Sequence, residues 1–238
     1  GTYTQANKWN TMGASTITGM VQGVAQPTFV EVGDDPERLR RAFSKMLRFT
    51  SFIAFPVMFG LSLVAPEFIV TLIKEKWLPS AHLMQILCIG GAFLPIATLY
   101  FNLIISRGKS DVYMWNIIAQ GCSILGTILV VYAFGGSTTH MVIAYSAIVI
   151  LWVGIWHIFL HQEIRYPFFS ALKDMLPFLV IAATTMAITY FATCWIESAP
   201  LLLISRILIA IPIYLGILRL FGAKILKECI GYLTKKKR

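Results

Sequence analysis

A row of uncharged polar residues lies near the start of the chain at helical spacing. Its members are Asn7, Thr11, Ser15, Thr18, Gln22 and Gln26. Each residue of a helix turns by about 100°, so these side chains share one narrow face. Amides and hydroxyls on such a face form hydrogen bonds, and in a membrane they line a water-filled cavity or join a neighbouring helix.

Both interpretations of this polar row stay open at this point. Tyr3 extends the row, and Lys8 is the one basic residue close to it. Gly19 and Gly23 are four residues apart, which favours close approach of another helix. A cavity lining would instead place Tyr3, Asn7, Lys8, Ser15, Gln22 and Gln26 on the wall of that cavity.

Further polar residues interrupt apolar stretches later in the chain. Asn102, and Asn116 with Gln120 one turn later, either face the same cavity or form packing contacts. Arg206 is costly in hydrocarbon, so it binds an anionic group, reaches outward to water or pairs with Glu197.

The sequence contains no arrangement typical of an enzyme. No nucleophile with a base, phosphate-binding loop or pair of carboxylates stands out. His157 and His161 are four residues apart but have no third metal ligand nearby. The four cysteines are widely spaced and are expected to be buried apolar residues. We therefore expect no catalytic residue, no metal and no cofactor.

The composition is that of an all-α integral membrane protein. Of the 238 residues, 57% are hydrophobic and only 13% are charged, far from the composition of a soluble domain. A nucleic-acid partner is not expected, because little of the chain can face water. The apolar stretches predict a bundle of about seven transmembrane helices. Their expected ranges are 5–30, 46–72, 82–106, 112–134, 139–160, 175–196 and 199–221.

The charges alternate between successive connections. Lys and Arg concentrate in the first, third and fifth connections and in the tail after Arg219, whereas the even connections contain only Lys74 and Lys76. The positive-inside rule therefore predicts odd connections and a C-terminus in the cytoplasm.

The first connection is the most highly charged part. Asp35 and Pro36 predict a helix start, with Leu39, Phe43, Met46 and Leu47 on one face. We expect either a short helix lying on the inner leaflet or a solvated loop. On such a helix, basic residues would lie near anionic lipid. These residues are Arg38, Arg41, Lys45 and Arg48.

Several motifs in the first half of the chain occur in a familiar order. They are GTYTQA at 1–6, GDDPER at 33–38, FP-x-x-x-GL-x-x-x-AP at 55–66, KW at 76–77 and SRGKSD at 106–111. Together they resemble polysaccharide exporters of the Wzx type, which are lipid-linked oligosaccharide flippases. This resemblance implies two lobes around a cavity that opens alternately to either side. The chain would then supply the C-terminal lobe (1–161), two trailing helices and a basic tail (162–238).

The same resemblance implies a substrate and a direction of transport. The substrate would be a polyprenyl-pyrophosphate-linked polysaccharide repeat unit, such as those used for lipopolysaccharide. It would be moved from the inner to the outer leaflet of a bacterial inner (plasma) membrane. The chain opens with Gly1 inside a motif, so we expect a fragment whose partner is a missing N-terminal half of the same protein. Alternatives are a multidrug/cation antiporter of the same superfamily, a membrane-embedded glycan ligase or polymerase, and a structural scaffold.

Overall fold

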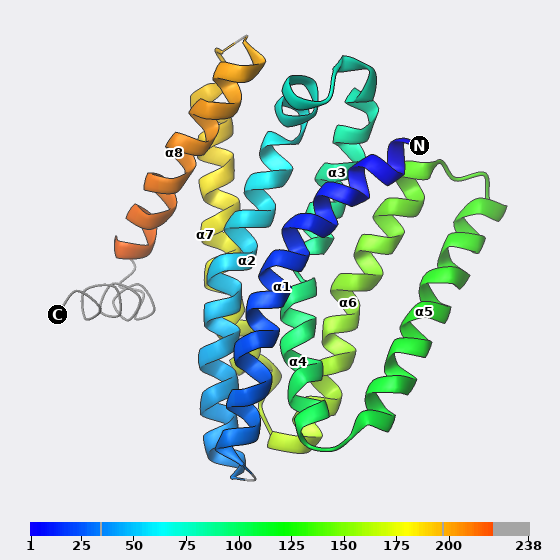
Figure 1. Cartoon of the computed structure of the whole chain (residues 1–238), viewed down its shortest axis with the longest axis vertical. Helices are drawn as coiled ribbons and strands as arrows, with labels where there is room; N and C mark the ends of the chain where they lie inside the picture. Colours follow the sequence, from blue (N-terminus) through cyan, green and yellow to red (C-terminus); the bar gives the residue numbers. More distant parts are fainter. Residues whose placement is uncertain (34, 197, 221–238) are drawn as a thin grey trace.

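The computed structural model describes residues 1–33, 35–196 and 198–220, and in these residues the chain is helical and contains no strand. A short 3-10 helix, Glu75–Trp77, precedes α3. The α-helices are α1 (Thr2–Val32), α2 (Pro36–Leu72), α3 (Leu78–Gly91), α4 (Leu94–Ser106), α5 (Ser110–Ala133), α6 (Thr138–Ile164), α7 (Phe168–Thr193) and α8 (Ala199–Leu220). They run up and down as roughly parallel rods (Figure 1).

Successive connections lie at alternate ends of the bundle. The α1–α2, α4–α5 and α6–α7 connections lie at the lower end of Figure 1, and Gly1 and the even connections lie at the upper end. The loops predicted to be rich in basic residues therefore share one end. The predicted tail and Glu197 lie outside the described residues.

The protein is a multi-pass membrane protein. Within the described residues, six helical segments are long and apolar enough to cross a membrane, with α3 and α4 counted together as the segment Glu75–Ser106. They correspond to the last six of the seven predicted segments. The remaining one, α1, has 31 residues and sufficient length, but its polar row makes it less apolar than the others.

The predicted surface helix before the second span does not exist as a separate element. Asp35 does cap a helix start, accepting hydrogen bonds from the backbone N–H groups of Glu37 and Arg38 at 2.9 and 3.3 Å. That helix is α2 itself, 37 residues without interruption. Leu39 and Phe43 are buried in the bundle, because the apolar face finds helix partners there and does not lie on a membrane surface.

The third predicted span is divided into two helices. Pro95 has no N–H to donate to the carbonyl of Gly91, so the helical hydrogen bonding is interrupted there. The turn between α3 and α4 is closed by a hydrogen bond from the Phe93 N–H to Gly90 O at 3.0 Å. The single helix predicted over 82–106 is therefore α3 followed by α4.

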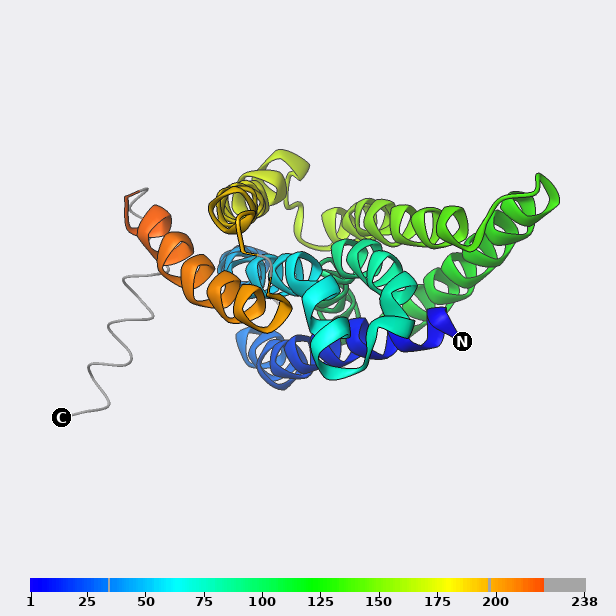
Figure 2. The same cartoon turned by 90° about the horizontal axis from the view of Figure 1, so that it is seen from above.

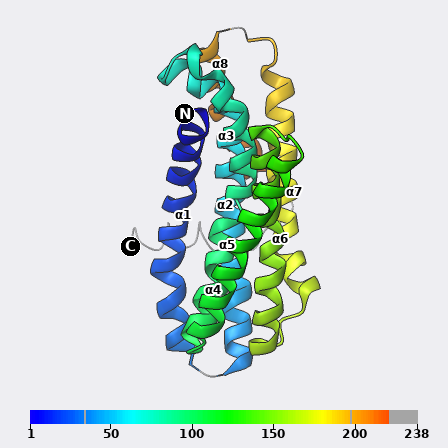
Figure 3. The same cartoon turned by 90° about the vertical axis from the view of Figure 1, so that its right-hand side faces the viewer.

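The centre of the bundle is α2. It contacts α1, α3, α7 and α8, and its buried residues Phe43, Phe55 and Met58 belong to the core. Viewed from above, α5 and α8 lie at opposite ends of the elongated cross-section (Figure 2). Viewed from the side, α1 and α7 lie on opposite faces (Figure 3). One whole face of α1 is therefore available for a contact other than the core.

Candidate functional site

The polar row of α1 lies beside the buried face of the helix and is mostly exposed. About 100° around the helix from the row, the residues at steps of three and four are buried: Ala6, Asn10, Ala14, Ile17, Val21, Ala25 and Phe29. Those residues pack against α2, α3 and α4. The polar row borders this buried face, and its side chains are exposed or half-buried.

None of the members of the polar row is fully buried. Thr11, Ser15, Gln22 and Gln26 are exposed, and Asn7 and Thr18 are half-buried. Within the row, Thr11 Oγ1 donates to Asn7 Oδ1 at 3.5 Å, and Ser15 Oγ donates to the Met12 carbonyl at 3.3 Å. In the described part of the chain, no other helix forms a hydrogen bond with the side chains of this row. The interpretation that the row joins a neighbouring helix therefore finds no partner helix among the described residues.

At the upper end of α1, an aromatic residue and a base accompany the row. Tyr3 is exposed at 42% of its surface, and Lys8 is also exposed. The Lys8 ammonium lies 5.6 Å from the centroid of the Trp9 ring, a cation–π distance. This is the one cation along α1, so any negative charge meeting this surface would approach its upper end.

The three other predicted cavity residues lie apart from the polar row. Asn102 on α4 is buried, with 3% of its surface exposed. Asn116 on α5 is also buried, and its Oδ1 accepts a hydrogen bond of 2.9 Å from Trp152 Nε1 on α6. Gln120 is half-buried on α5, which packs against α6 and α4.

The four predicted membrane-surface cations lie at the lower end of α2. Arg38, Arg41 and Lys45 are exposed, whereas Arg48 is half-buried. Arg48 Nε lies 3.8 Å from Asp174 Oδ1 on α7. Arg48 is therefore already part of a contact between helices.

Asp174 is the centre of a polar cluster at the lower end. Its Oδ2 accepts hydrogen bonds from Ser44 on α2 and, at 2.5 Å, from Tyr166 in the α6–α7 connection. Burial and the hydrogen bond to Asp174 raise the pKa of Tyr166 above its ordinary value. Because Asp174 lies on α7 and Ser44 on α2, this cluster fixes α7 to the rest of the bundle.

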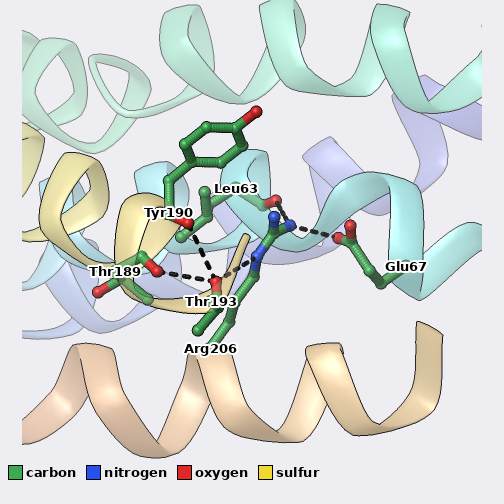
Figure 4. A network of polar contacts seen from close by, with 6 residues as sticks. All are labelled: Leu63, Glu67, Thr189, Tyr190, Thr193 and Arg206. Atoms are coloured by element: carbon green, nitrogen blue, oxygen red, sulfur yellow. Dashed lines mark hydrogen bonds and ion pairs between the residues drawn. The ribbon is translucent and has the colours of Figure 1, made fainter. Parts of the chain in front are cut away.

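A second polar cluster lies near the upper end, and sequence analysis did not find it. Arg206 on α8 is 5% exposed, and its Nη1 lies 2.7 Å from Glu67 Oε2 on α2 (Figure 4). Nη1 also donates to the Leu63 carbonyl at 2.9 Å, and Nε donates to Thr193 Oγ1 at 3.4 Å.

The pair differs from what the sequence suggested for Arg206. The side chain is enclosed and does not extend outward to water, because a carboxylate, a carbonyl and a hydroxyl lie within its reach. One feature of the sequence could have indicated this pair, namely the similar distance of both residues from the upper ends of their helices. Glu67 is five residues from the upper end of α2, and Arg206 is seven from the start of α8.

A hollow of about 760 Å³ lies between α1, α2 and α8. Its lining is apolar apart from a few groups, among them Thr16, Arg206 and Tyr214. None of the residues of the polar row lines it. The exposed surface of α1 therefore has two different sides, a hydrophilic one and an apolar one.

The acidic, cysteine and histidine residues in the described part of the chain do not form a metal cluster, because no group of three or more of them could hold a metal ion. The two histidines of the i, i+4 pair have other partners: His157 Nδ1 lies 3.3 Å from Tyr100 Oη, and His161 Nδ1 lies 2.9 Å from the Tyr166 carbonyl. The polar row and the two ion-pair clusters thus remain the polar features to be explained.

Comparisons with known proteins agree with the motifs. Residues 1–82 match a family described as polysaccharide biosynthesis protein. An uncharacterized membrane protein in the cps region of Klebsiella pneumoniae is 35% identical over 97 residues, covering 41% of this chain and 20% of that protein. The lipopolysaccharide biosynthesis protein WzxC of Escherichia coli (strain K12) is 28% identical over 96 residues, covering 40% and 20%.

A third relative extends the similarity into the second half. The teichuronic acid biosynthesis protein TuaB of Bacillus subtilis (strain 168) is 25% identical over 191 residues, covering 77% of this chain and 38% of TuaB. The chain thus spans between about a fifth and two fifths of these relatives. No solved structure matches the chain significantly. The resemblance predicted from the motifs is confirmed as a similarity: the first third of the chain matches a polysaccharide biosynthesis family, and the similar proteins include the Wzx-type protein WzxC.

Proposed function

We propose that this chain is the C-terminal lobe, with two trailing helices, of an exporter for polyprenyl-pyrophosphate-linked polysaccharide repeat units. The exporter moves each unit from the inner to the outer leaflet of the bacterial inner membrane. The observation that carries the proposal is the outward-facing polar row of α1, above all Gln22 and Gln26, which have no hydrogen-bonding partner among the described residues.

The polar surface of α1 has the chemical groups that such transport requires. A sugar and pyrophosphate headgroup cannot cross about 30 Å of hydrocarbon unless polar groups replace its water. Hydroxyls and amides spaced along 20 residues, from Asn7 to Gln26, offer donors and acceptors across that thickness. The second wall of the passage would come from the N-terminal half of the intact protein, and rocking of the two halves would expose the passage to alternate sides.

Transport, and not catalysis, is the activity proposed. Movement of a substrate needs hydrogen-bonding groups along a path, whereas bond cleavage needs an activated nucleophile or acid–base pair. WzxC and TuaB carry names that place them in lipopolysaccharide and teichuronic acid biosynthesis. Those names support a polysaccharide substrate for the present chain. The basic lower end of α2 supports a cytoplasmic position for that end of the bundle, so that transport would begin on the cytoplasmic side.

The test is the double substitution Gln22→Leu/Gln26→Leu in the intact protein. We expect export of lipid-linked glycan to fall at least tenfold while the amount of protein in the membrane is unchanged. Val30→Leu, an exposed apolar position on the same helix, is the matched control and should export normally. Normal export by the double variant would remove the assignment of this surface to the substrate path.

A further inference from the structure

Tyr214 of α8 forms a hydrogen bond across the helix boundary to the backbone of α2. Its Oη donates to the carbonyl of Phe52 at 2.9 Å. In an uninterrupted helix, that carbonyl accepts from the N–H four residues later. The residue four positions later is Pro56, which has no N–H. Tyr214 therefore supplies the hydrogen bond that Pro56 removes from α2.

This replacement matters because of the surroundings. Hydrocarbon offers no donor to an unpaired carbonyl, so a proline inside a spanning helix is tolerated only where a neighbour satisfies the freed group. Tyr214 is buried, and its ring lies 6.0 Å from the ring of Phe52. The hydroxyl is thus held at the Phe52 carbonyl by packing of its own ring.

The hollow between α1, α2 and α8 lies beside the same point of α2. Pro56, Val57 and Gly60 line it from α2, and Tyr214 lines it from α8. Close-packed interiors resist bending of a helix, whereas a helix beside free volume can move into it. A Cβ added at Gly60 would meet one atom of Met186 at 3.5 Å, so this part of α2 is loosely surrounded.

We infer that Pro56 is a hinge of α2 and that Tyr214 is the positioning residue that sets its angle. The proline removes one helical hydrogen bond, the hollow accepts the displaced segment, and the tyrosine hydroxyl holds the carbonyl in one arrangement. Its role in export rests on the proposed function, because bending of α2 would tilt the upper half of the lobe relative to the lower. The hinge itself does not depend on that function.

A double-mutant cycle tests the hinge in the intact protein. Tyr214→Phe removes only the hydroxyl, and we expect it to lower the rate of glycan export about fivefold to tenfold, as for one lost hydrogen bond. Pro56→Ala restores an N–H for the Phe52 carbonyl. Adding Tyr214→Phe to Pro56→Ala should therefore cause no further loss. Tyr132→Phe, at a tyrosine with 70% of its surface exposed on α5, is the matched control.

Spin-label distances provide a readout that does not need the substrate. Labels at Phe49→Cys and Thr71→Cys, exposed positions on either side of Pro56, are introduced after replacement of the native cysteines. We expect Tyr214→Phe to broaden the distance distribution with Pro56 present, and to leave it unchanged with Pro56→Ala.

The outcomes separate the hinge from the proposed function. Equal broadening by Tyr214→Phe in both backgrounds, or no broadening in either, would overturn the hinge. Distances that respond as expected in a protein that exports no glycan would leave the hinge in place and remove the proposed function.

Discussion

The guanidinium of Arg206 on α8 lies 2.7 Å from the carboxylate of Glu67 on α2, and both side chains are enclosed by α2, α7 and α8. At the other end of the bundle, Asp174 on α7 meets Arg48 and Ser44 on α2. The trailing helices are thus attached to α2 by charged groups at both ends. This arrangement predicts that α7 follows the lower half of α2 and α8 follows its upper half.

Breaking the upper ion pair should destabilise the protein strongly. Arg206→Met leaves the Glu67 carboxylate without its partner in an apolar setting, and we expect a loss of about 3–5 kcal/mol in the free energy of unfolding. Arg206→Met combined with Glu67→Leu should recover part of this loss, because no charge is left buried. Thermal unfolding followed by tryptophan fluorescence measures both. Arg219→Met, at an exposed arginine of the same helix, is the control. If the losses in free energy of unfolding of Arg206→Met and Glu67→Leu simply added in the double variant, the pairing would be contradicted.

Gly91 should tolerate no larger residue unless Asn10 is shortened. A Cβ at Gly91 would overlap the Oδ1 atom of Asn10 and approach Met58 Cε to 2.8 Å. We expect Gly91→Ala to cost about 1–3 kcal/mol through overpacking of α3 against α1. Asn10→Ala in the same molecule should restore much of that stability. Gly126→Ala, where no atom lies within 4 Å of the added Cβ, is the matched control.

The stability of the protein should depend on Tyr166 at alkaline pH. Burial and Asp174 raise its pKa in the folded protein above the ordinary value of 10, so the unfolded chain releases this proton first. The resulting stability is fully present below pH 10 and is lost as pH rises further. Between pH 8 and pH 11 we expect the wild type to lose about 1.4 kcal/mol more than Tyr166→Phe. Identical pH profiles of the two proteins in chemical unfolding would show that the prediction is wrong.

The Trp152–Asn116 bond distinguishes a packing role from a cavity role for Asn116. Asn116→Leu leaves the buried Trp152 N–H without its acceptor, and we expect a loss of about 1–3 kcal/mol. Trp152→Phe combined with Asn116→Leu removes both partners and should be nearly as stable as Trp152→Phe alone. Unfolding midpoints in detergent test this. If the double variant folds well but no longer exports glycan, Asn116 belongs to the substrate path after all.

Much of the architecture follows directly from the order of residues. Apolar stretches of about 20 residues must form helices in a bilayer, because no other backbone partner is available there. Asp35 followed by Pro36 predicted where α2 begins, and basic loops predicted which connections share an end. The polar row of α1 was visible from spacing alone, since helical periodicity is a local property.

The partners of the polar groups were decided only by tertiary structure. Glu67 and Arg206 are 139 residues apart, and nothing local indicates that α8 packs on α2. Likewise, the first turns of α2 had an amphipathic pattern that fits a membrane surface or a helix bundle equally well. Periodicity identifies the apolar face of a helix but not what covers it. In the folded bundle, other helices cover Leu39 and Phe43, whereas no helix among the described residues covers the polar row of α1.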